Sequence, residues 1–347
     1  MAKTKFPKPQ YLGAKFHLLD WITQFIPESC HTILDGFGGS QSFAYRVKEL
    51  GYKVITNDFL LSQAMIGNAL IVNKSERLDE ENLACLFELN KNKEKYNLME
   101  TQFKDLFFNE EDCKFLDAFR SNVDFYFHGD FNRTALALAI MDRAMTRKVT
   151  MGHFAHTKAM EYSSNPDRLK RNPSLGTPLK NLFLDLVDDY NNAVFDNGYE
   201  NFSFNTNILE LLPIVNDKID LAYFDPPYCG CHADYQSFYH VIETYCRYWK
   251  NKEFVNSIHR YEPKMESGFD KKLSIKETFD KMFSLSKNIP YWLVSYNDGS
   301  YPTEDEMVGL IEQYKKVTVK KFEYQNARGG KGSVKGRKEL LFVCSPL

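Results

Sequence analysis

The chain has 347 residues and a mass of 40.4 kDa, which suits one large α/β domain carrying an insertion, because single cores stop growing at roughly 250 to 300 residues. Its content of 43% hydrophobic and 26% charged residues excludes a disordered or collagen-like chain. Lys and Arg number 44 against 46 Asp and Glu, a formal charge of −2, so a polyanion site is expected only as a local basic patch.

The first predicted elements alternate between strand and helix. Residues 31–35 predict a short buried strand, the glycine-rich residues 36–39 a turn, and residues 41–50 a helix. Residues 52–57 predict a second strand. This alternation is typical of a sheet whose strands run parallel.

The middle of the chain has a different character. From about residue 75 to 201 glycines become sparse and charged helical stretches dominate, while Tyr, Phe and Arg recur between residues 119 and 171. We therefore predict an insertion over residues 76–201, with residues 1–75 and 202–347 forming the sheet domain.

The last third returns to alternating elements and ends in two strands. The predicted fold is α/β, a doubly wound and mainly parallel sheet to which the last two strands add an antiparallel hairpin. The pattern predicts helices over residues 208–212, 271–288 and 303–314, and strands over residues 219–224, 291–296, 318–324 and 339–344.

A glycine-rich turn follows the first predicted strand in Asp35-Gly-Phe-Gly-Gly39, where small residues let a ligand approach the backbone closely. Asp58 follows the second strand, about 20 residues later, where a carboxylate can accept hydrogen bonds from a ribose. Both dinucleotides and S-adenosylmethionine present such a ribose, so the turn alone does not choose between them.

The most specific motif is Asp225-Pro-Pro-Tyr228, directly after the apolar strand predicted at residues 219–224. The carboxyl ends of parallel strands are where open α/β sheets bind ligands, and two prolines there fix the backbone. A carboxylate and a main-chain carbonyl can both accept from an exocyclic amine, and Tyr228 offers a stacking face. The motif therefore indicates a site for a planar base that carries an amine.

These motifs resemble the D12 (Dam-like) class of N6-adenine-specific DNA methyltransferases, which contains many modification enzymes of type II restriction systems. The resemblance implies the seven-stranded sheet of the class I S-adenosylmethionine-dependent methyltransferases, with a target-recognition domain in the insertion. Besides the Asp225 motif, the matching segments are Tyr11-Leu-Gly-Ala-Lys15, Asp35-Gly-Phe-Gly-Gly39, Asn57-Asp58, Tyr239-His-Val-Ile-Glu243 and Glu339-Leu-Leu-Phe342.

The same resemblance implies roles for individual residues. Two departures stand out, because Asn207 replaces an aspartate that reaches the cofactor's adenine amine and Gln41 replaces a glycine of the turn. The catalytic residues implied are Asp225, Pro226, Pro227 and Tyr228, and the cofactor-binding residues are Tyr11, Lys15, Asp35, Phe37, Gly38, Gly39, Asp58, Asn207, Ile208 and Asp225.

The chemistry implied is transfer of a methyl group from S-adenosylmethionine to the N6 amine of an adenine extruded from double-stranded DNA. Asp225 and the carbonyl of Pro226 would hold the amine while Tyr228 stacks on the ring. No covalent enzyme intermediate and no metal are needed. The histidines His153 and His156 lack a third ligand in the sequence, which argues against a metal site.

A duplex substrate requires positive charge, and residues 315–338 carry the strongest local excess. A second group of basic residues lies in the insertion. The DNA-binding residues expected from these two regions are Arg143, Arg147, Lys148, Arg168, Lys170, Arg171, Arg328, Lys331, Lys335 and Arg337.

The seven cysteines lack the paired spacing of zinc sites and disulfide frameworks, so reduced thiols in the cytoplasm are expected. No apolar run reaches about 18 residues, so no membrane segment is expected. By the resemblance the protein acts as a monomer, and a restriction endonuclease acting at the same site is a second possible partner.

Three other functions stay open at this level. An N4-cytosine methyltransferase would hold a similar amine, although Ser is more usual at the position of Asp225. A nicotinamide-dependent oxidoreductase would use the same glycine turn and Asp58 but would leave the Asp225 motif unexplained. A DNA-binding module without catalysis is the third. The recognition sequence cannot be read from the chain.

Overall fold

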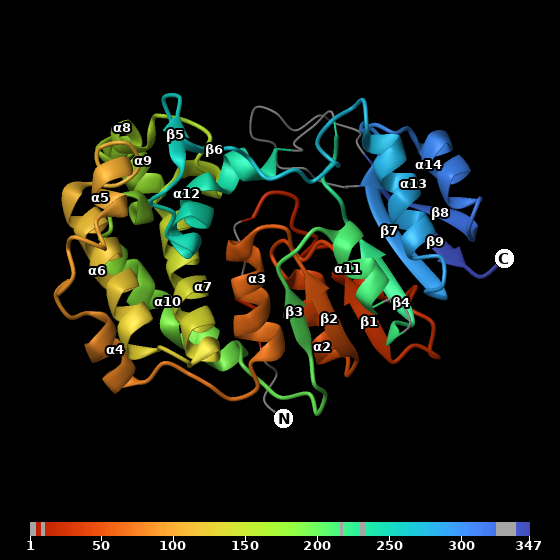
Figure 1. Cartoon of the computed structure of the whole chain (residues 1–347), viewed down its shortest axis with the longest axis horizontal. Coiled ribbons are helices and arrows are strands. Elements are labelled where there is room, and N and C mark those ends of the chain that lie inside the picture. The colour runs from red at the N-terminus through yellow and green to blue at the C-terminus, as the bar shows by residue number, and fades with distance from the viewer. Residues whose placement is uncertain (1–4, 8–10, 216–217, 230–233, 324–337) are drawn as a thin grey trace.

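The computed structural model describes residues 5–7, 11–215, 218–229, 234–323 and 338–347. Within these ranges seven strands form one sheet in the order β3-β2-β1-β4-β7-β9-β8 (Figure 1). The strands are β1 (Thr32–Asp35), β2 (Lys53–Asn57), β3 (Phe202–Phe204), β4 (Leu221–Phe224), β7 (Tyr291–Asn297), β8 (Lys316–Glu323) and β9 (Lys338–Ser345).

The direction of the strands confirms the predicted fold class. Strands β3, β2, β1, β4 and β7 pair in parallel, whereas β9 runs antiparallel to both of its neighbours, β7 and β8. Strand β3 is the one member of this sheet that the sequence did not predict. It has three residues, none of them fully buried, so it shows neither the length nor the apolar run of its neighbours.

Alternating side chains on the strands divide the core into two layers. Ile33 and Tyr223 belong to the cluster on one face of the sheet, and Leu34 and Phe224 belong to the cluster on the other. The first face is covered by α1 (Leu19–Thr23) and α2 (Ser42–Glu49), and the second by α11 (Ile208–Val215), α13 (Ile275–Leu285) and α14 (Glu304–Ile311).

The residues between β2 and β3 are helical, as predicted for the middle of the chain, and most of them lie to the left of the sheet in Figure 1. We call residues 80–193 the helical lobe. Its long helix α7 packs against α10 within the lobe and against α3, which borders the sheet. The helices are α3 (Leu61–Gly67), the π-helix η1 (Asn68–Val72), α4 (Glu80–Leu86), α5 (Leu98–Gln102), α6 (Glu110–Tyr126), α7 (Phe131–Arg147), η2 (Thr150–Gly152), α8 (Ala159–Ser163), α9 (Pro166–Arg171), η3 (Pro173–Leu175) and α10 (Leu179–Ala193).

Helix α12 (Tyr235–Arg247) and the small hairpin of β5 (Glu253–Val255) and β6 (Arg260–Glu262) lie beside the helical lobe, although they follow β4 in the chain (Figure 1). The Tyr245 hydroxyl donates to the Leu116 carbonyl at 3.2 Å, and the Tyr248 hydroxyl donates to Asp117 at 2.6 Å. The segment after the Asp225 motif is therefore anchored in the lobe.

None of the helices in the described parts of the chain has the length and hydropathy that a membrane span requires. Cys30, Cys85, Cys113, Cys229, Cys246 and Cys344 are free thiols.

Candidate active site

Three carboxylates meet where three adjacent parallel strands end. Asp35 is the last residue of β1, Asp58 directly follows β2, and Asp225 directly follows β4. The strand order β2-β1-β4 places their carboxyl ends side by side. All three residues line a cleft of about 950 Å³, open mouth included. The predicted position of the site, at the carboxyl edge of the sheet, agrees with this cleft.

Most of the residues expected at the cofactor and the base line this one cleft, but two do not. Asn207 lies at the start of α11, where its Oδ1 accepts the Leu209 N–H at 3.0 Å and its Nδ2 donates to the Glu266 carbonyl at 3.3 Å. Ile208 packs in the core with Phe224. The predicted residues that line the cleft are Tyr11, Lys15, Asp35, Phe37, Gly38, Gly39, Asp58, Asp225, Pro226, Pro227 and Tyr228.

Gln41 lies beneath the glycine turn and does not line the cleft. Its Oε1 accepts the Thr56 hydroxyl at 2.7 Å, and its Nε2 donates to the Gln63 carbonyl at 3.3 Å. A Cβ on Gly38 would come within 2.2 Å of that Nε2, so a side chain at residue 38 would displace the buried Gln41 amide. The Gln41 amide is therefore engaged by Thr56 and Gln63 beneath the turn.

Burial sets the protonation of the two carboxylates nearest the turn. Asp35 is 1% exposed, and burial, reinforced by the charge of Asp225, raises its pKa to about 8. Burial likewise raises the pKa of Asp58 to about 7, although its oxygens accept the N–H groups of Gly39 at 2.7 Å and Leu60 at 2.8 Å.

Among the residues that the structure describes, none donates a hydrogen bond to the Oδ1 atom of Asp35. Buried carboxylate oxygens ordinarily accept a hydrogen bond or contact a cation, so this oxygen indicates that a bound ligand supplies the donor or the cation. S-adenosylmethionine carries an ammonium and a sulfonium, and the carboxylates Asp35, Asp58 and Asp225 in one cleft fit a ligand of net positive charge. The residues present therefore fit this cofactor.

Asp225 lies in a cluster with Lys15, Tyr228 and Glu339. Lys15 Nζ donates to both oxygens of Asp225 at 2.9 Å and lies 3.4 Å from Glu339. The Tyr228 hydroxyl lies 2.9 Å from Asp225 Oδ1 and 2.6 Å from Glu339 Oε1. Burial lowers the pKa of Lys15, but the carboxylates of Asp225 and Glu339 outweigh burial and hold it above its usual value, so Lys15 is a cation.

Glu339 has no role among the sequence predictions beyond its place in the last strand. It is the one acidic residue of β9 and directly precedes the apolar run Leu340-Leu-Phe-Val343, and it is 4% exposed. An acid at a buried position of a strand is unusual, and this was the feature from which the sequence could have identified it.

Aromatic rings connect the N-terminal segment to α12. The Tyr11 ring stacks on Tyr239 with centroids 4.6 Å apart and on Tyr235 at 5.6 Å, and the Leu12 N–H donates to the Tyr239 hydroxyl at 2.7 Å. The sequence alone does not separate core tyrosines from tyrosines that line a site, and the structure places these two differently. Tyr239 is fully buried in the core, whereas Tyr235 lines the cleft.

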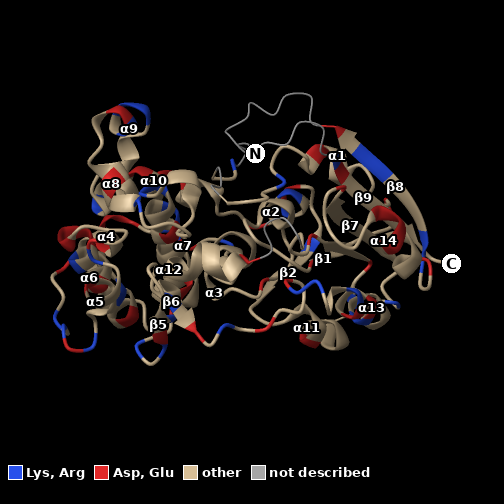
Figure 2. Ribbon diagram, turned by 90° about the horizontal axis from the view of Figure 1, so that it is seen from above, with Lys and Arg blue, Asp and Glu red and all other residues tan. Residues whose placement is uncertain are grey.

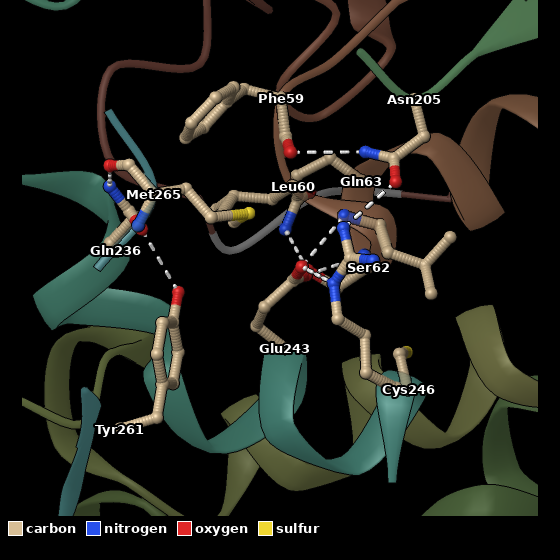
Figure 3. A network of polar contacts seen from close by, with 12 residues as sticks. Phe59, Leu60, Ser62, Gln63, Asn205, Gln236, Glu243, Cys246, Tyr261 and Met265 are labelled. Atoms are coloured by element: carbon tan, nitrogen blue, oxygen red, sulfur yellow. Dashed lines mark hydrogen bonds and ion pairs between the residues drawn. The ribbon is translucent and has the colours of Figure 1, made fainter. Parts of the chain in front are cut away.

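A second polar network joins α12 to the loop that carries Asp58 (Figure 3). Buried Glu243 accepts the N–H groups of Leu61 at 3.0 Å and Ser62 at 2.9 Å, at the start of α3. Arg247 donates to Glu243 at 2.6 Å and to Asn205 Oδ1 at 2.9 Å.

Asn205 completes this connection. Its Nδ2 donates to the carbonyls of Asp58 and Phe59, each at 3.0 Å. Helix α12, which follows the Asp225 motif, therefore fixes the position of the Asp58 backbone through Arg247 and Asn205.

We expect Arg247→Ala to lower the free energy of unfolding by about 3 kcal/mol, because it leaves the fully buried Glu243 carboxylate without its cation. Urea denaturation measures this loss. Affinity for S-adenosylmethionine should also fall, since Asn205 loses the partner that orients it. Lys74→Ala, which breaks an exposed pair with Glu200, is the control and should leave the free energy of unfolding close to the wild-type value. Equal losses for the two variants would contradict the role of Arg247.

The basic residues expected at DNA separate into two groups. Lys148 is buried and pairs with Asp112 at 2.9 Å, and Arg143 is half-buried in α7. Arg147 donates to Ser174 at 3.1 Å. Lys148 in particular is engaged inside the lobe, so the expectation that it contacts DNA does not hold for this conformation.

The other group lies on α9. Lys170 and Arg171 are exposed, and the Arg168 guanidinium lies 3.5 Å from the centroid of the Tyr162 ring. Figure 2 shows basic residues on α9 and along β8. Arg328, Lys331, Lys335 and Arg337 lie outside the described residues.

Within the described ranges there is no group of three or more His, Cys, Asp or Glu residues placed to hold a metal ion. His156 instead lies 3.0 Å from the Thr150 hydroxyl, and its ring centroid is 6.0 Å from that of His153.

Comparison with known proteins identifies the family. The model of the D12 class N6 adenine-specific DNA methyltransferases matches residues 11–297. The chain is 32% identical to the Type II methyltransferase M2.HphI of Haemophilus parahaemolyticus, over 99% of each chain. It is 23% identical to the Type II methyltransferase M.CviAII of Paramecium bursaria Chlorella virus 1, over 89% of each chain. The chain therefore belongs to the D12 class of N6 adenine-specific DNA methyltransferases.

Proposed function

We propose that the cleft binds S-adenosylmethionine beside an adenine extruded from duplex DNA, and that Asp225 and the Pro226 carbonyl hold its N6 amine. The observation that carries this proposal is the position of Asp225, at the end of β4 in the same cleft as Asp35 and Asp58. A base inside a duplex cannot reach such a cleft, so the adenine must leave the stack.

The cofactor would lie against the glycine turn. Asp35, whose Oδ1 has no donor among the described residues, would face a cationic group of S-adenosylmethionine. Asp58 lies at the end of β2, where a ribose hydroxyl can donate to it. Gly38 and Gly39 allow close approach of the backbone. When bound, S-adenosylmethionine supplies an activated methyl group.

Asp225 would accept a hydrogen bond from the amine and take its proton as the nitrogen becomes positively charged. Lys15 lies 4.7 Å from the centroid of the Tyr228 ring and covers one of its faces. The adenine would therefore stack on the other face of Tyr228 or on Tyr235, which also lines the cleft.

The test is transfer of labelled methyl from S-adenosylmethionine to unmethylated duplex DNA, followed by mass spectrometry of the digested nucleosides. The expected product is N6-methyladenine. N4-methylcytosine would overturn the assignment of the base, and binding of S-adenosylmethionine without transfer to DNA of diverse sequence would overturn the duplex substrate.

We also propose that residues 76–201 recognise the DNA target, with Arg168, Lys170 and Arg171 on phosphates. Lys170→Ala and Arg171→Ala should each weaken binding similarly on all sequences and reduce the slope of log K against log salt by about 1. Fluorescence anisotropy between 50 and 200 mM salt, roughly the range over which such contacts are lost, measures the slope. Lys281→Ala, an exposed lysine of α13, is the control. An unchanged slope would remove α9 from the interface.

The biological setting follows from the two relatives, both of which are named Type II methyltransferases. We propose a site-specific enzyme of a restriction-modification system, which acts as a monomer in the cytoplasm and protects DNA from an endonuclease of the same specificity without a stable complex. Plasmid DNA methylated by the enzyme should resist one of a panel of type II endonucleases and remain sensitive to the others.

A further inference from the structure

Asp225 is already engaged by donors in this structure. The Lys15 ammonium contacts both of its oxygens at 2.9 Å, and the Tyr228 hydroxyl lies 2.9 Å from Oδ1. A carboxylate held by an ammonium in this way is a weak acceptor for a further donor and a weak base, because its charge is already compensated. Asp225 would hold an adenine amine more strongly, and accept its proton more readily, once these two donors turn elsewhere.

Glu339 is the group to which both donors can turn. Lys15 Nζ is 3.4 Å from Glu339 Oε1, so a small displacement brings it into contact. The Tyr228 hydroxyl has one proton to give and lies closer to Glu339, at 2.6 Å, than to Asp225. Glu339 is 4% exposed and does not line the cleft, so it reaches the reacting groups only through Lys15 and Tyr228.

We propose that Glu339 is a positioning residue that takes over Lys15 and the Tyr228 hydroxyl when adenine enters, and so frees Asp225 to hold the N6 amine. This inference rests on the proposed function and adds a residue to which that function assigns no role. Two carboxylates share one ammonium in the cluster, and the net negative charge that results stabilises the positive charge that develops on the amine.

The groups that face Glu339 come from every side of the cluster. They are the Lys15 ammonium, the Asp225 carboxylate and the phenols of Tyr228, Tyr223 and Tyr235. Burial raises the pKa of Glu339, Lys15 lowers it and Asp225 raises it, and the net direction is upward. Protonation of Glu339 would remove the charge that attracts Lys15, and Glu339→Gln imitates that protonated form.

The experiment is single-turnover methyl transfer, with the enzyme preincubated with saturating S-adenosylmethionine and then mixed with duplex DNA. We expect Glu339→Gln to lower the transfer rate on the order of 10 to 100-fold, which corresponds to the loss of one charge-assisted hydrogen bond. Dissociation constants for cofactor and DNA should stay within about threefold. Glu312→Gln, an exposed glutamate at the end of α14, is the matched control and should keep the wild-type rate.

The pH dependence separates positioning from a structural role. The wild-type rate should fall as the pH is lowered through the titration of Glu339, whereas Glu339→Gln should lack this step, so the two rates converge at low pH. Glu339→Asp keeps the charge on a shorter side chain and should recover part of the rate. This second variant also serves if Glu339→Gln does not fold.

Each outcome decides between the alternatives. A wild-type rate for Glu339→Gln, with an active wild-type enzyme, overturns the role of Glu339 and leaves the proposed function standing. A parallel loss of rate, cofactor affinity and thermal stability, with no difference in pH profile, shows that Glu339 is merely structural. Absence of transfer by the wild-type enzyme itself overturns the proposed function, and the inference with it.

Discussion

Asp225→Asn is expected to lower the rate of methyl transfer by roughly 10²-fold to 10⁴-fold, the range for loss of a positioned acid or base. The amide keeps the shape of the side chain and one acceptor oxygen but loses the charge and the capacity to take a proton. It also leaves Lys15 with Glu339 as its only carboxylate within this cluster. Single-turnover assays with saturating cofactor and DNA measure the effect.

The control for this experiment is Asp188→Asn, an exposed aspartate of α10 far along the chain from the site, which should retain the wild-type rate. Binding of duplex DNA to Asp225→Asn should persist, since the phosphate contacts proposed on α9 are unchanged. An Asp225→Asn enzyme with near-normal turnover would show that another group accepts the amine.

Asp35→Asn is expected to weaken binding of S-adenosylmethionine by about 10-fold to 100-fold at pH 8, because a charge-assisted hydrogen bond is worth about 1.5 to 3 kcal/mol. The same change should stabilise the protein without cofactor. Burial raises the pKa of Asp35 from its ordinary value of 3.8 to about 8, so the folded state disfavours the ionised form.

The pH dependence of this stabilisation has a definite sign. A carboxyl group whose pKa is raised by folding contributes most to stability below about pH 4, and that contribution is lost as the pH rises toward 8. The advantage in melting temperature of Asp35→Asn over the wild type should therefore grow between pH 4 and pH 8. Thermal unfolding across this range, combined with calorimetric titration of the cofactor, tests both effects. A constant advantage would show that the Asp35 carboxylate is not destabilised by burial.

The strands at the centre of the sheet were predictable from the sequence because they are short apolar runs followed by turn residues such as glycine and proline. The strand before Asp225 and the strand before the glycine turn were both found, and these two strands place Asp35 and Asp225. Strand β3 was missed because Phe202–Phe204 is short and half exposed, so its place at the sheet edge depends on tertiary pairing with β2.

Contacts between distant parts of the chain were beyond sequence reasoning. Asn207 was expected in the cofactor site from its place in a motif, yet its side chain caps α11 and contacts Glu266. Lys148 was expected at DNA from its charge, but pairing with Asp112 in the lobe satisfies it. In both cases the residue type was compatible with two environments, and only the packing of the chain selects one.

Lys15 and Glu339, which meet at Asp225, are separated by almost the whole chain. A ribosome makes the chain in the order of its residues, so Lys15 and Asp225 are both made before β9, which carries Glu339. The cluster around Asp225 can therefore close only after β9 has joined the sheet between β7 and β8. A chain that stops before β9 would be unable to assemble this cluster, so methylating activity is expected only once β9 has been made and has paired.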